Sequence, residues 1–268
     1  MRWLFAKYAG CGNDFILFDN RRGDFPKSPR LFQKLCHRQW GIGADGVILL
    51  ELSTQAHARM RIFNADGSEA EMCGNGIRCL VHWMQSLGFS QTVYSIETMQ
   101  RLLKAWVIGQ DVRIEMGSPT HLQWNVPIDH ESTSLRIHSL DTGVPHAILF
   151  VSDIEANLKQ LGPFIRHHPY WSPKGTNFSV VKRLDEMTFA IRTFERGVED
   201  ETLACGTGAT AAALAAAHQF KLQGPLKMQT RSGDCLDIHF SFQNGQFTDV
   251  TMTGPAVKIF QGEVDLYP

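Results

Sequence analysis

The 268-residue sequence has almost no net charge and contains no long apolar run. Its 26 Lys and Arg residues nearly balance its 27 Asp and Glu residues, which gives a formal charge of −1. This balance offers no electrostatic basis for binding nucleic acid or an anionic membrane surface. Because no apolar stretch reaches the length of a membrane span, we expect no membrane segment. The stretch before Cys11 is short and interrupted by Lys7, so we interpret it as a β-strand rather than a signal.

The cysteines lack the spacings of the common cysteine-based sites. No two of them form a Cys-x-x-Cys pair, and none has a histidine at zinc-finger spacing, which disfavours a metal site. A disulfide framework is not expected in a chain of this size without a secretion signal. We therefore expect reduced thiols, no metal and a cytoplasmic location. The six residues are Cys11, Cys36, Cys73, Cys79, Cys205 and Cys235.

Two of these cysteines lie in matching turns, Met72–Gly76 (MCGNG) and Ala204–Gly208 (ACGTG). After the first turn, apolar residues recur at i, i+3, i+4 and i+7, which predicts a helix that Gly88 closes. After the second turn, Ala209–Ala217 consists almost entirely of small residues. Such a helix lies close to strands on several sides, so we expect it at the centre of a domain. The high helix propensity of alanine is an alternative explanation for the run.

The chain reads as an internal duplication. Each half contains short β-like runs, an acidic loop, a Cys-Gly-x-Gly turn, one helix and further β-like runs. The acidic loops are 64–69 in the first half and 195–201 in the second. Near Ser118-Pro119 the pattern restarts, which predicts domains at 1–118 and 119–256. A further helix is expected from Ser28-Pro29 to about Gln39, because Ser at the cap is followed by Pro in the first turn.

A cysteine at a helix N-terminus lies at the positive end of the helix dipole, beside N–H groups without helical partners. This setting lowers the pKa of a thiol from about 8.5 toward neutrality. The glycines that follow let a ligand approach the backbone closely. If both turns face one cavity, a carboxylate bridges the two helix starts and its α-carbon lies between the sulfurs. The pattern then predicts two-base proton transfer at that carbon, with fixed N–H donors stabilising the developing charge.

Two other classes of protein share parts of this pattern. Residues Gly206–Ala211 fit the dinucleotide fingerprint G-x-G-x-x-A. That fingerprint follows directly on a hydrophobic strand, whereas an acidic loop precedes this turn. A redox or metal-binding cysteine pair is the third interpretation, and the missing spacings disfavour it. Titrating the thiols in the presence of amino acids, NAD or zinc would separate the three.

Several ordered sequence blocks occur along the whole chain. They are Gly12–Phe15, Gly41–Gly46, Phe63–Ser68, Cys73–Cys79, Pro145-His146, Glu195–Gly197 and Cys205–Gly208. Together these blocks resemble the diaminopimelate epimerase family, which interconverts LL- and meso-diaminopimelate without a cofactor, for lysine and peptidoglycan synthesis. Proline racemases are similar in fold and chemistry, but their first cysteine motif differs from Cys-Gly-Asn-Gly.

This resemblance implies an α+β fold of two pseudo-symmetric domains, each a largely antiparallel curled sheet or barrel around a central helix. A final strand near Val257–Leu266, within a C-terminal segment 257–268, is expected to complete the first domain. The resemblance also implies a homodimer, an amino-acid substrate and an active site between the domains.

By the same resemblance, Cys73 and Cys205 form the acid/base pair and exchange roles with reaction direction. His146 and Glu195 are implied as the groups that assist the thiols. From the sequence alone, His146 is equally well interpreted as a residue that stabilises the turn after Pro145.

The family also implies substrate-binding residues. Asn13 is expected near the reacting centre, and Asn64 with Glu195-Arg196 at the distal end of the substrate. Without the resemblance, Arg196 reads as a surface charge and the two asparagines as turn residues. The residues implied to hold the reacting carboxylate are Gly74, Asn75, Gly206 and Thr207.

The chain departs from the family pattern at two positions. Val144 stands where the family has Asn before Pro-His, and Gly175 stands where the family has a second Asn of the distal site. Asn177 is a possible replacement donor, and the loop 198–201 is one residue longer than usual. Since a charge-assisted hydrogen bond contributes about 1.5–3 kcal/mol, we expect weaker distal binding and relaxed selectivity, including racemisation of shorter acidic amino acids such as glutamate.

Overall fold

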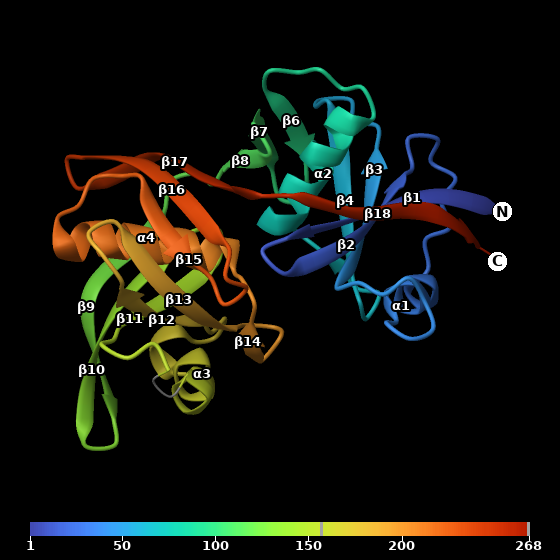
Figure 1. Cartoon of the computed structure of the whole chain (residues 1–268). Helices are drawn as coiled ribbons and strands as arrows, with labels where there is room; N and C mark the ends of the chain where they lie inside the picture. The colour runs from blue at the N-terminus through green and yellow to red at the C-terminus, as the bar shows by residue number, and fades with distance from the viewer. Residues whose placement is uncertain (156–157, 267–268) are drawn as a thin grey trace. The chain divides into compact units, whose positions relative to one another are not determined.

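The computed structural model describes residues 1–155 and 158–266 (Figure 1). It forms two compact units, which we call unit 1 (Met1–Ile114 with Gly254–Pro268) and unit 2 (Glu115–Thr253). Residues 267 and 268, which belong to the expected C-terminal segment, lie outside the described residues. Among the described residues, no helix is long and apolar enough to cross a membrane.

Unit 1 is a curled mixed sheet around one helix, α2 (Gly74–Ser86). The helix contacts β1, β2, β3, β4, β7 and β18, so strands cover it on several sides. The pairs β2–β3 and β4–β6 are parallel, and β18–β1, β1–β2, β3–β4, β4–β5, β6–β7 and β7–β8 are antiparallel. The strands are β1 (Arg2–Gly10), β2 (Asn13–Asp19), β3 (Gly46–Glu51), β4 (Ala58–Asn64), β5 (Glu69–Ala70), β6 (Tyr94–Glu97), β7 (Leu102–Ile108), β8 (Asp111–Glu115) and β18 (Val257–Asp265).

Unit 2 repeats this arrangement around α4 (Gly206–Phe220). The pairs β11–β12 and β13–β15 are parallel, and β9–β10, β10–β11, β12–β13, β13–β14, β15–β16 and β16–β17 are antiparallel. The predicted duplication is therefore confirmed, with β18 taking in unit 1 the place that β9 takes in unit 2. The strands are β9 (Thr120–His130), β10 (Thr133–Asp141), β11 (Pro145–Phe150), β12 (Asn177–Arg183), β13 (Thr188–Glu195), β14 (Asp200–Thr202), β15 (Leu226–Gln229), β16 (Cys235–Gln243) and β17 (Gln246–Pro255).

The composition of the two central helices explains how each fits inside a sheet. In α4, every residue from Gly208 to Ala217 is buried, and the small side chains let strands approach from many directions. In α2, the predicted closure at Gly88 is confirmed. Gly88 has φ +93°, and the amide of Phe89 donates to the carbonyl of Met84 at 3.1 Å, as in a Schellman cap. The second helix ends at left-handed Lys221, before Gly224-Pro225.

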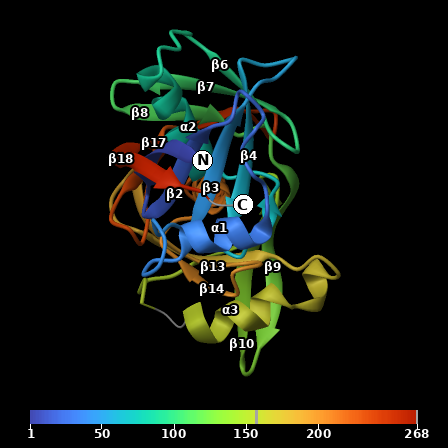
Figure 2. The ribbon, with the colours of Figure 1, turned by 90° about the vertical axis from the view of Figure 1, so that its right-hand side faces the viewer.

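Two further helices, α1 (Pro29–Cys36) and α3 (Leu158–Arg166), lie outside the strands of their own units (Figures 1 and 2). Ser28 caps α1 as expected, because its hydroxyl accepts from the amide of Leu31 at 3.3 Å. The helix ends at Cys36 rather than near Gln39, since His37 already has an extended backbone. Buried apolar residues of α1 pack into the core of unit 1, each contributing about 1.5–3 kcal/mol.

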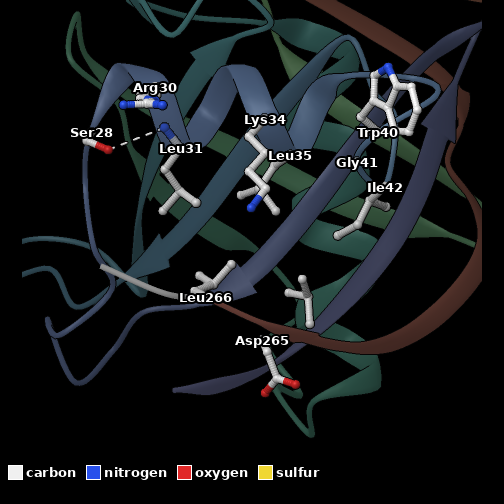
Figure 3. Close-up of a pocket in the computed structure, with 11 residues that line it drawn as sticks. Ser28, Arg30, Leu31, Lys34, Leu35, Trp40, Gly41, Ile42, Asp265 and Leu266 are labelled. Carbon is white, nitrogen blue, oxygen red and sulfur yellow. Dashed lines mark hydrogen bonds between the residues drawn. The ribbon is translucent and has the colours of Figure 1, made fainter.

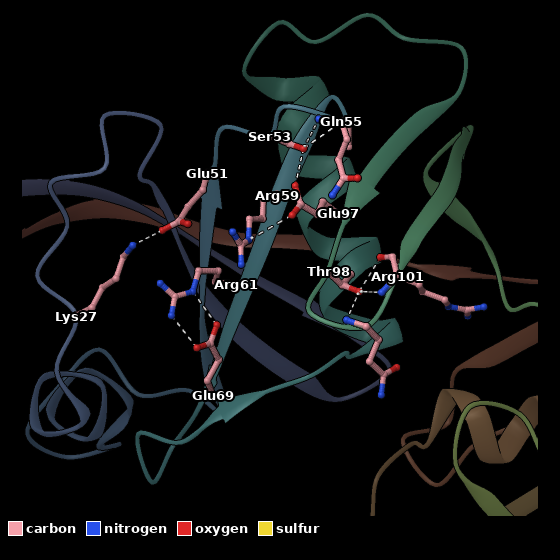
Figure 4. Close-up of polar contacts among 12 residues, drawn as sticks. Lys27, Glu51, Ser53, Gln55, Arg59, Arg61, Glu69, Glu97, Thr98 and Arg101 are labelled. Carbon is pink, nitrogen blue, oxygen red and sulfur yellow. Dashed lines mark hydrogen bonds and ion pairs between the residues drawn. The ribbon is translucent and has the colours of Figure 1, made fainter.

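Each unit also contains an arginine–glutamate pair at the same register position, which we call a clamp. Arg61 contacts Glu69 through two hydrogen bonds of 2.7 Å (Figure 4). Arg192 contacts Glu201 through bonds of 2.7 and 2.6 Å. Each glutamate lies opposite the penultimate residue of the preceding strand, Phe63 or Phe194. Each also precedes its turn cysteine by four residues, so the clamps fix the strands that lead into the two turns.

Candidate active site

Cys73 is the N-cap of α2, with an extended backbone at φ −147° and ψ 115°. Its Sγ accepts a hydrogen bond from the amide of Gly76 at 3.4 Å. A hydrogen bond donated to sulfur favours the thiolate over the thiol. A Cβ at residue 76 would lie 3.1 Å from Ile48 and 3.2 Å from Ile62, so the glycine lets the start of the helix pack against β3 and β4.

Cys205 occupies the same position at the start of α4. Its Sγ lies 3.5 Å from Oγ1 of Thr207. The hydroxyl of Thr142 donates to the carbonyl of Thr207 at 3.0 Å and so holds the first turn of the helix. A Cβ at Gly208 would lie 3.3 Å from Sγ, which makes Gly208 the counterpart of Gly76. Both turns therefore present a sulfur beside helical N–H groups that have no partner within the helix.

In unit 1, some of the remaining expected site residues lie together at the first turn, and one does not. Asn75, the second residue of α2, donates from Nδ2 to Oδ1 of Asn13 at 2.7 Å, so these two lie together. Gly74 begins the helix beside them. Asn64, at the end of β4, is exposed and donates to Oγ of Ser68 at 3.0 Å within its own loop.

In unit 2, Glu195 ends β13, just as Asn64 ends β4. Burial raises the pKa of Glu195, and a 2.9 Å hydrogen bond from the Thr202 hydroxyl partly opposes this rise. The backbone amide of Arg196 donates to Oδ1 of Asn177 at 2.8 Å. Its guanidinium donates to the carbonyl of Lys174 at 3.3 Å, so Arg196 is fixed at both ends.

His146 is completely buried in β11. Burial, together with the charge of Arg196, lowers the pKa of the imidazole to about 3, so the ring is neutral near pH 7. Neither ring nitrogen has a hydrogen-bond partner among residues 1–155 and 158–266. The ring therefore supplies no positive charge near pH 7.

The other cysteines have a different environment. Burial raises the pKa of the Cys36 thiol to about 11 and that of Cys79 to about 12. Burial also raises the pKa of the Cys235 thiol. These three thiols stay protonated near neutral pH. Cys11 is almost fully buried.

Each unit contains at least one cavity of its own. One of about 640 Å³ lies in unit 1 between α1, the loop at Trp40 and the end of β18, and no expected site residue lines it (Figure 3). Another of about 500 Å³ in unit 2 is lined by Pro145 and Lys174, beside the segments that Asn177 joins. No cluster of three or more potential metal ligands occurs in the described parts of the chain.

A family model described as diaminopimelate epimerase matches residues 5–122 and 138–259. The chain belongs to the diaminopimelate epimerase family. The diaminopimelate epimerase of Methanothrix thermoacetophila is 40% identical, over 97% of this chain and 95% of that protein. The one from Moorella thermoacetica is 38% identical, over 98% and 99%. An isomerase activity of the amino-acid epimerase class follows from this membership.

Solved structures share the fold at low sequence identity. A phenazine biosynthesis protein of the PhzF family from Bacillus anthracis has a TM-score of 0.76 at 16% identity, covering 99% of this chain and 100% of that one. A hydroxyproline epimerase from Agrobacterium vitis, solved with trans-4-hydroxy-L-proline, has a TM-score of 0.70 at 17% identity, covering 98% and 92%. The predicted fold class is confirmed. A doubly wound dinucleotide-binding fold is excluded, because each unit wraps strands around one helix.

The structure corrects the assignment of Gly175 within this epimerase. Its φ is +66°, and a Cβ there would lie 2.5 Å from the carbonyl oxygen of Arg166, so no asparagine side chain fits at that position. The available amide is that of Asn177, at the start of β12. Its Oδ1 accepts from Arg196, and its Nδ2 donates to the carbonyl of Pro145 at 3.2 Å. Asn177 therefore joins the Pro-His and Glu-Arg segments, and Val144 remains a departure from the family pattern.

Sequence reasoning assigned no role to Arg78, Asp45 or Thr202. Arg78 lies within the first cysteine motif but is fully buried, flanked by Ile77, Cys79 and Leu80. A charge at a core position of a helix is the signal that identifies it, since charged side chains are rarely buried without a purpose. Thr202 gave no comparable signal, because its contact with Glu195 depends on the pairing of β13 with β14.

Proposed function

We propose that this epimerase converts LL- to meso-diaminopimelate, with Cys73 and Cys205 as its two acid/base groups. The observation that supports this most directly is the duplicated N-cap cysteine, once at the start of each buried helix. The proposal treats units 1 and 2 as the two domains of the sequence prediction, with one substrate held between the two turns. The resulting activity serves lysine and peptidoglycan synthesis in the cytoplasm, where thiols stay reduced.

The proposed reaction is a proton exchange at the α-carbon. One thiolate removes the α-proton and becomes a thiol, and the electron pair moves toward the carboxylate. Amides at Gly74-Asn75 and Gly206-Thr207 stabilise that charge. The opposite thiol then donates its proton to the other face of the carbon and becomes a thiolate. No net oxidation occurs, and fixed N–H donors replace a cofactor as the means of stabilising the carbanion.

The surrounding residues have separate proposed roles. Glu195, with its raised pKa, exchanges a proton with the thiols or the substrate amine, and His146 acts only as a neutral ring. Asn64 and Arg196 bind the distal end of the substrate. Val144 supplies no donor there, so selectivity against shorter acidic amino acids such as glutamate is reduced.

We also propose a homodimer. Several large apolar side chains on neighbouring strands β1 and β18 are exposed, which is costly unless another surface covers them. They are Leu4, Val257, Ile259 and Phe260, with exposures of 70, 54, 54 and 45%.

Exchange of the α-proton with solvent tests the two-thiol mechanism. In D₂O, the wild type is expected to incorporate deuterium at the α-carbon of diaminopimelate during turnover. Cys73→Ser and Cys205→Ser should both lose epimerisation, because serine is too weak an acid for this transfer near pH 7. Cys235→Ser, in a strand outside both turns, is the matched control and should retain activity. Near-wild-type turnover by either turn variant would refute the proposal.

Selectivity is tested by the ratio of kcat/KM for diaminopimelate to kcat/KM for glutamate. Val144→Asn restores a donor, so this ratio should rise by about tenfold, the value of one charge-assisted hydrogen bond. Val93→Asn, an exposed valine of the other unit far from Val144 in sequence, controls for the substitution type. A high ratio in the wild type that Val144→Asn leaves unchanged would contradict the assignment of Val144.

A further inference from the structure

We propose that Arg78 and Asp45 are positioning residues, which fix the orientation of two side-chain amides that bind the substrate carboxylate. The amides are those of Asn13 and Asn75, and the inference rests on the proposed function. All four residues belong to unit 1.

Arg78 carries a fully buried charge without an opposite charge beside it. Its Nη2 donates to Oδ1 of Asn75 at 2.8 Å and to Sγ of Cys11 at 3.3 Å, and its Nε donates to the carbonyl of Pro255 at 3.2 Å. Within the described residues, no Asp or Glu forms an ion pair with it, and Nη1 has no hydrogen-bond partner. A buried cation without a carboxylate partner is costly, so a benefit other than stability is expected.

That benefit is a defined orientation of the neighbouring asparagine side chains. Arginine has only donors, so the atom of Asn75 that faces Arg78 must be the oxygen. The Nδ2 of Asn75 therefore points to Asn13, whose facing atom must be Oδ1. The Nδ2 of Asn13 in turn donates to Oδ2 of Asp45 at 3.0 Å. A carboxylate only accepts. Arg78 at one end of this hydrogen-bond series and Asp45 at the other therefore impose the same orientation on both side-chain amides.

Asp45 is held firmly at its end of the chain. Its Oδ1 accepts from Nη2 of Arg38 at 2.7 Å, and its Oδ2 also accepts from the amide of Asp14 at 3.3 Å. Both contacts leave the hydrogen bond between Asp45 and Asn13 in place. Asp45, the acceptor end of the series, is therefore as fixed as Arg78, the donor end.

The orientation of the two side chains determines which groups they present to a ligand. Each Nδ2 carries two hydrogens, and one of them is donated within the hydrogen-bond series. Among the residues that the structure describes, no acceptor receives the second hydrogen of either amide. Both side chains therefore present N–H donors beside the first cysteine turn, which suits a carboxylate and opposes a bound ammonium group.

The test compares Arg78→Met, Asp45→Asn and the double variant. Methionine keeps an apolar stem but has no donor. Asparagine at position 45 can present its NH₂ group to Asn13 and so reverse the direction of the hydrogen bonds. Each single variant is expected to raise KM for diaminopimelate about tenfold or more, with a smaller change in kcat. Because both ends act on one chain, the double variant should resemble the worse single variant, whereas independent structural contacts would give multiplied effects.

Two controls separate this role from stability. Arg38→Met removes one of the two anchors of Asp45 but leaves its Oδ2 for Asn13, so KM should rise less than in Asp45→Asn. Arg21→Met removes an exposed arginine paired with Asp19 and should have no effect. If Arg78→Met does not fold, Asp45→Asn alone decides, since Asp45 is partly exposed.

Wild-type KM in folded Arg78→Met or Asp45→Asn would overturn the inference, as would multiplied effects in the double variant. Deuterium exchange by the wild type distinguishes failure of the proposed function from failure of the positioning role. If the wild type exchanges no α-proton, the proposed function fails. If it exchanges normally and these variants keep its KM, only the positioning role fails.

Discussion

At the scale of single residues, the two units carry different side chains at equivalent positions. Asn64 and Glu195 each end the strand before an acidic loop, yet one is a neutral amide and the other a partly buried acid. Phe15 and His146 each lie opposite the first residue of the following parallel strand. Duplication therefore preserved the positions, and the side chains at those positions diverged.

The buried histidine makes stability depend on pH. Its folded pKa of about 3 lies below the unfolded value near 6.5, so between these values the unfolded chain binds a proton that the native protein does not. Stability is thus lost as pH falls from about 6.5 toward 3, by about 1.4 kcal/mol per pH unit from this group. In His146→Phe, urea unfolding between pH 6 and 4 should show a slope smaller by that amount. An unchanged slope would show that the ring is not buried in its neutral form.

The hydroxyl of Thr202 is expected to tune Glu195. It donates to the carboxyl group and so lowers a pKa that burial raises. Thr202→Val keeps the shape but removes the donor, so the pKa of Glu195 rises further. The acidic limb of the kcat/KM profile should then move to higher pH. Thr248→Val, on an exposed part of β17, should leave the profile unmoved.

At the scale of elements, local patterns predicted what local forces determine. Both central helices, the capped start at Ser28 and the longer strands follow from periodicity and capping. The strands β5 and β14 are only two or three residues long, so they are too short to show an apolar alternation. The cysteine turns were predictable for the same local reason. The chain from Arg78 to Asp45 was not, because it joins residues 33 positions apart through tertiary contacts.

The two clamps should contribute unequally to stability. Arg61 and Glu69 are 23 and 24% exposed, whereas Arg192 and Glu201 are 10 and 14% exposed. Glu69→Gln is therefore expected to lower the free energy of unfolding by about 1 kcal/mol, and Glu201→Gln by about 2–3 kcal/mol. Since they lie in different units, the effects should add in the double variant. Glu263→Gln, in an exposed pair with Arg2, is the control and should cost almost nothing in urea denaturation.

At the scale of the whole molecule, the proposed mechanism needs both sulfurs on opposite faces of one carbon. Without substrate, only a modest approach would then bring them to disulfide distance. Mild oxidation should inactivate the wild type, and a reductant should restore activity. Peptide mapping should find Cys73 linked to Cys205, and neither Cys73→Ser nor Cys205→Ser should form this link. Activity that survives oxidation would argue against a shared substrate between the turns.

The strand β18 gives the chain an order of assembly. It pairs with β1 along almost its whole length, although all of unit 2 separates the two in sequence. During synthesis, unit 2 has every strand it needs before β18 emerges from the ribosome, while unit 1 still has β1 as an uncovered edge. Folding on the ribosome should therefore finish with the part that was made first. Slow translation through unit 2 would prolong the exposure of that edge, and with it the risk of misassembly between nascent chains.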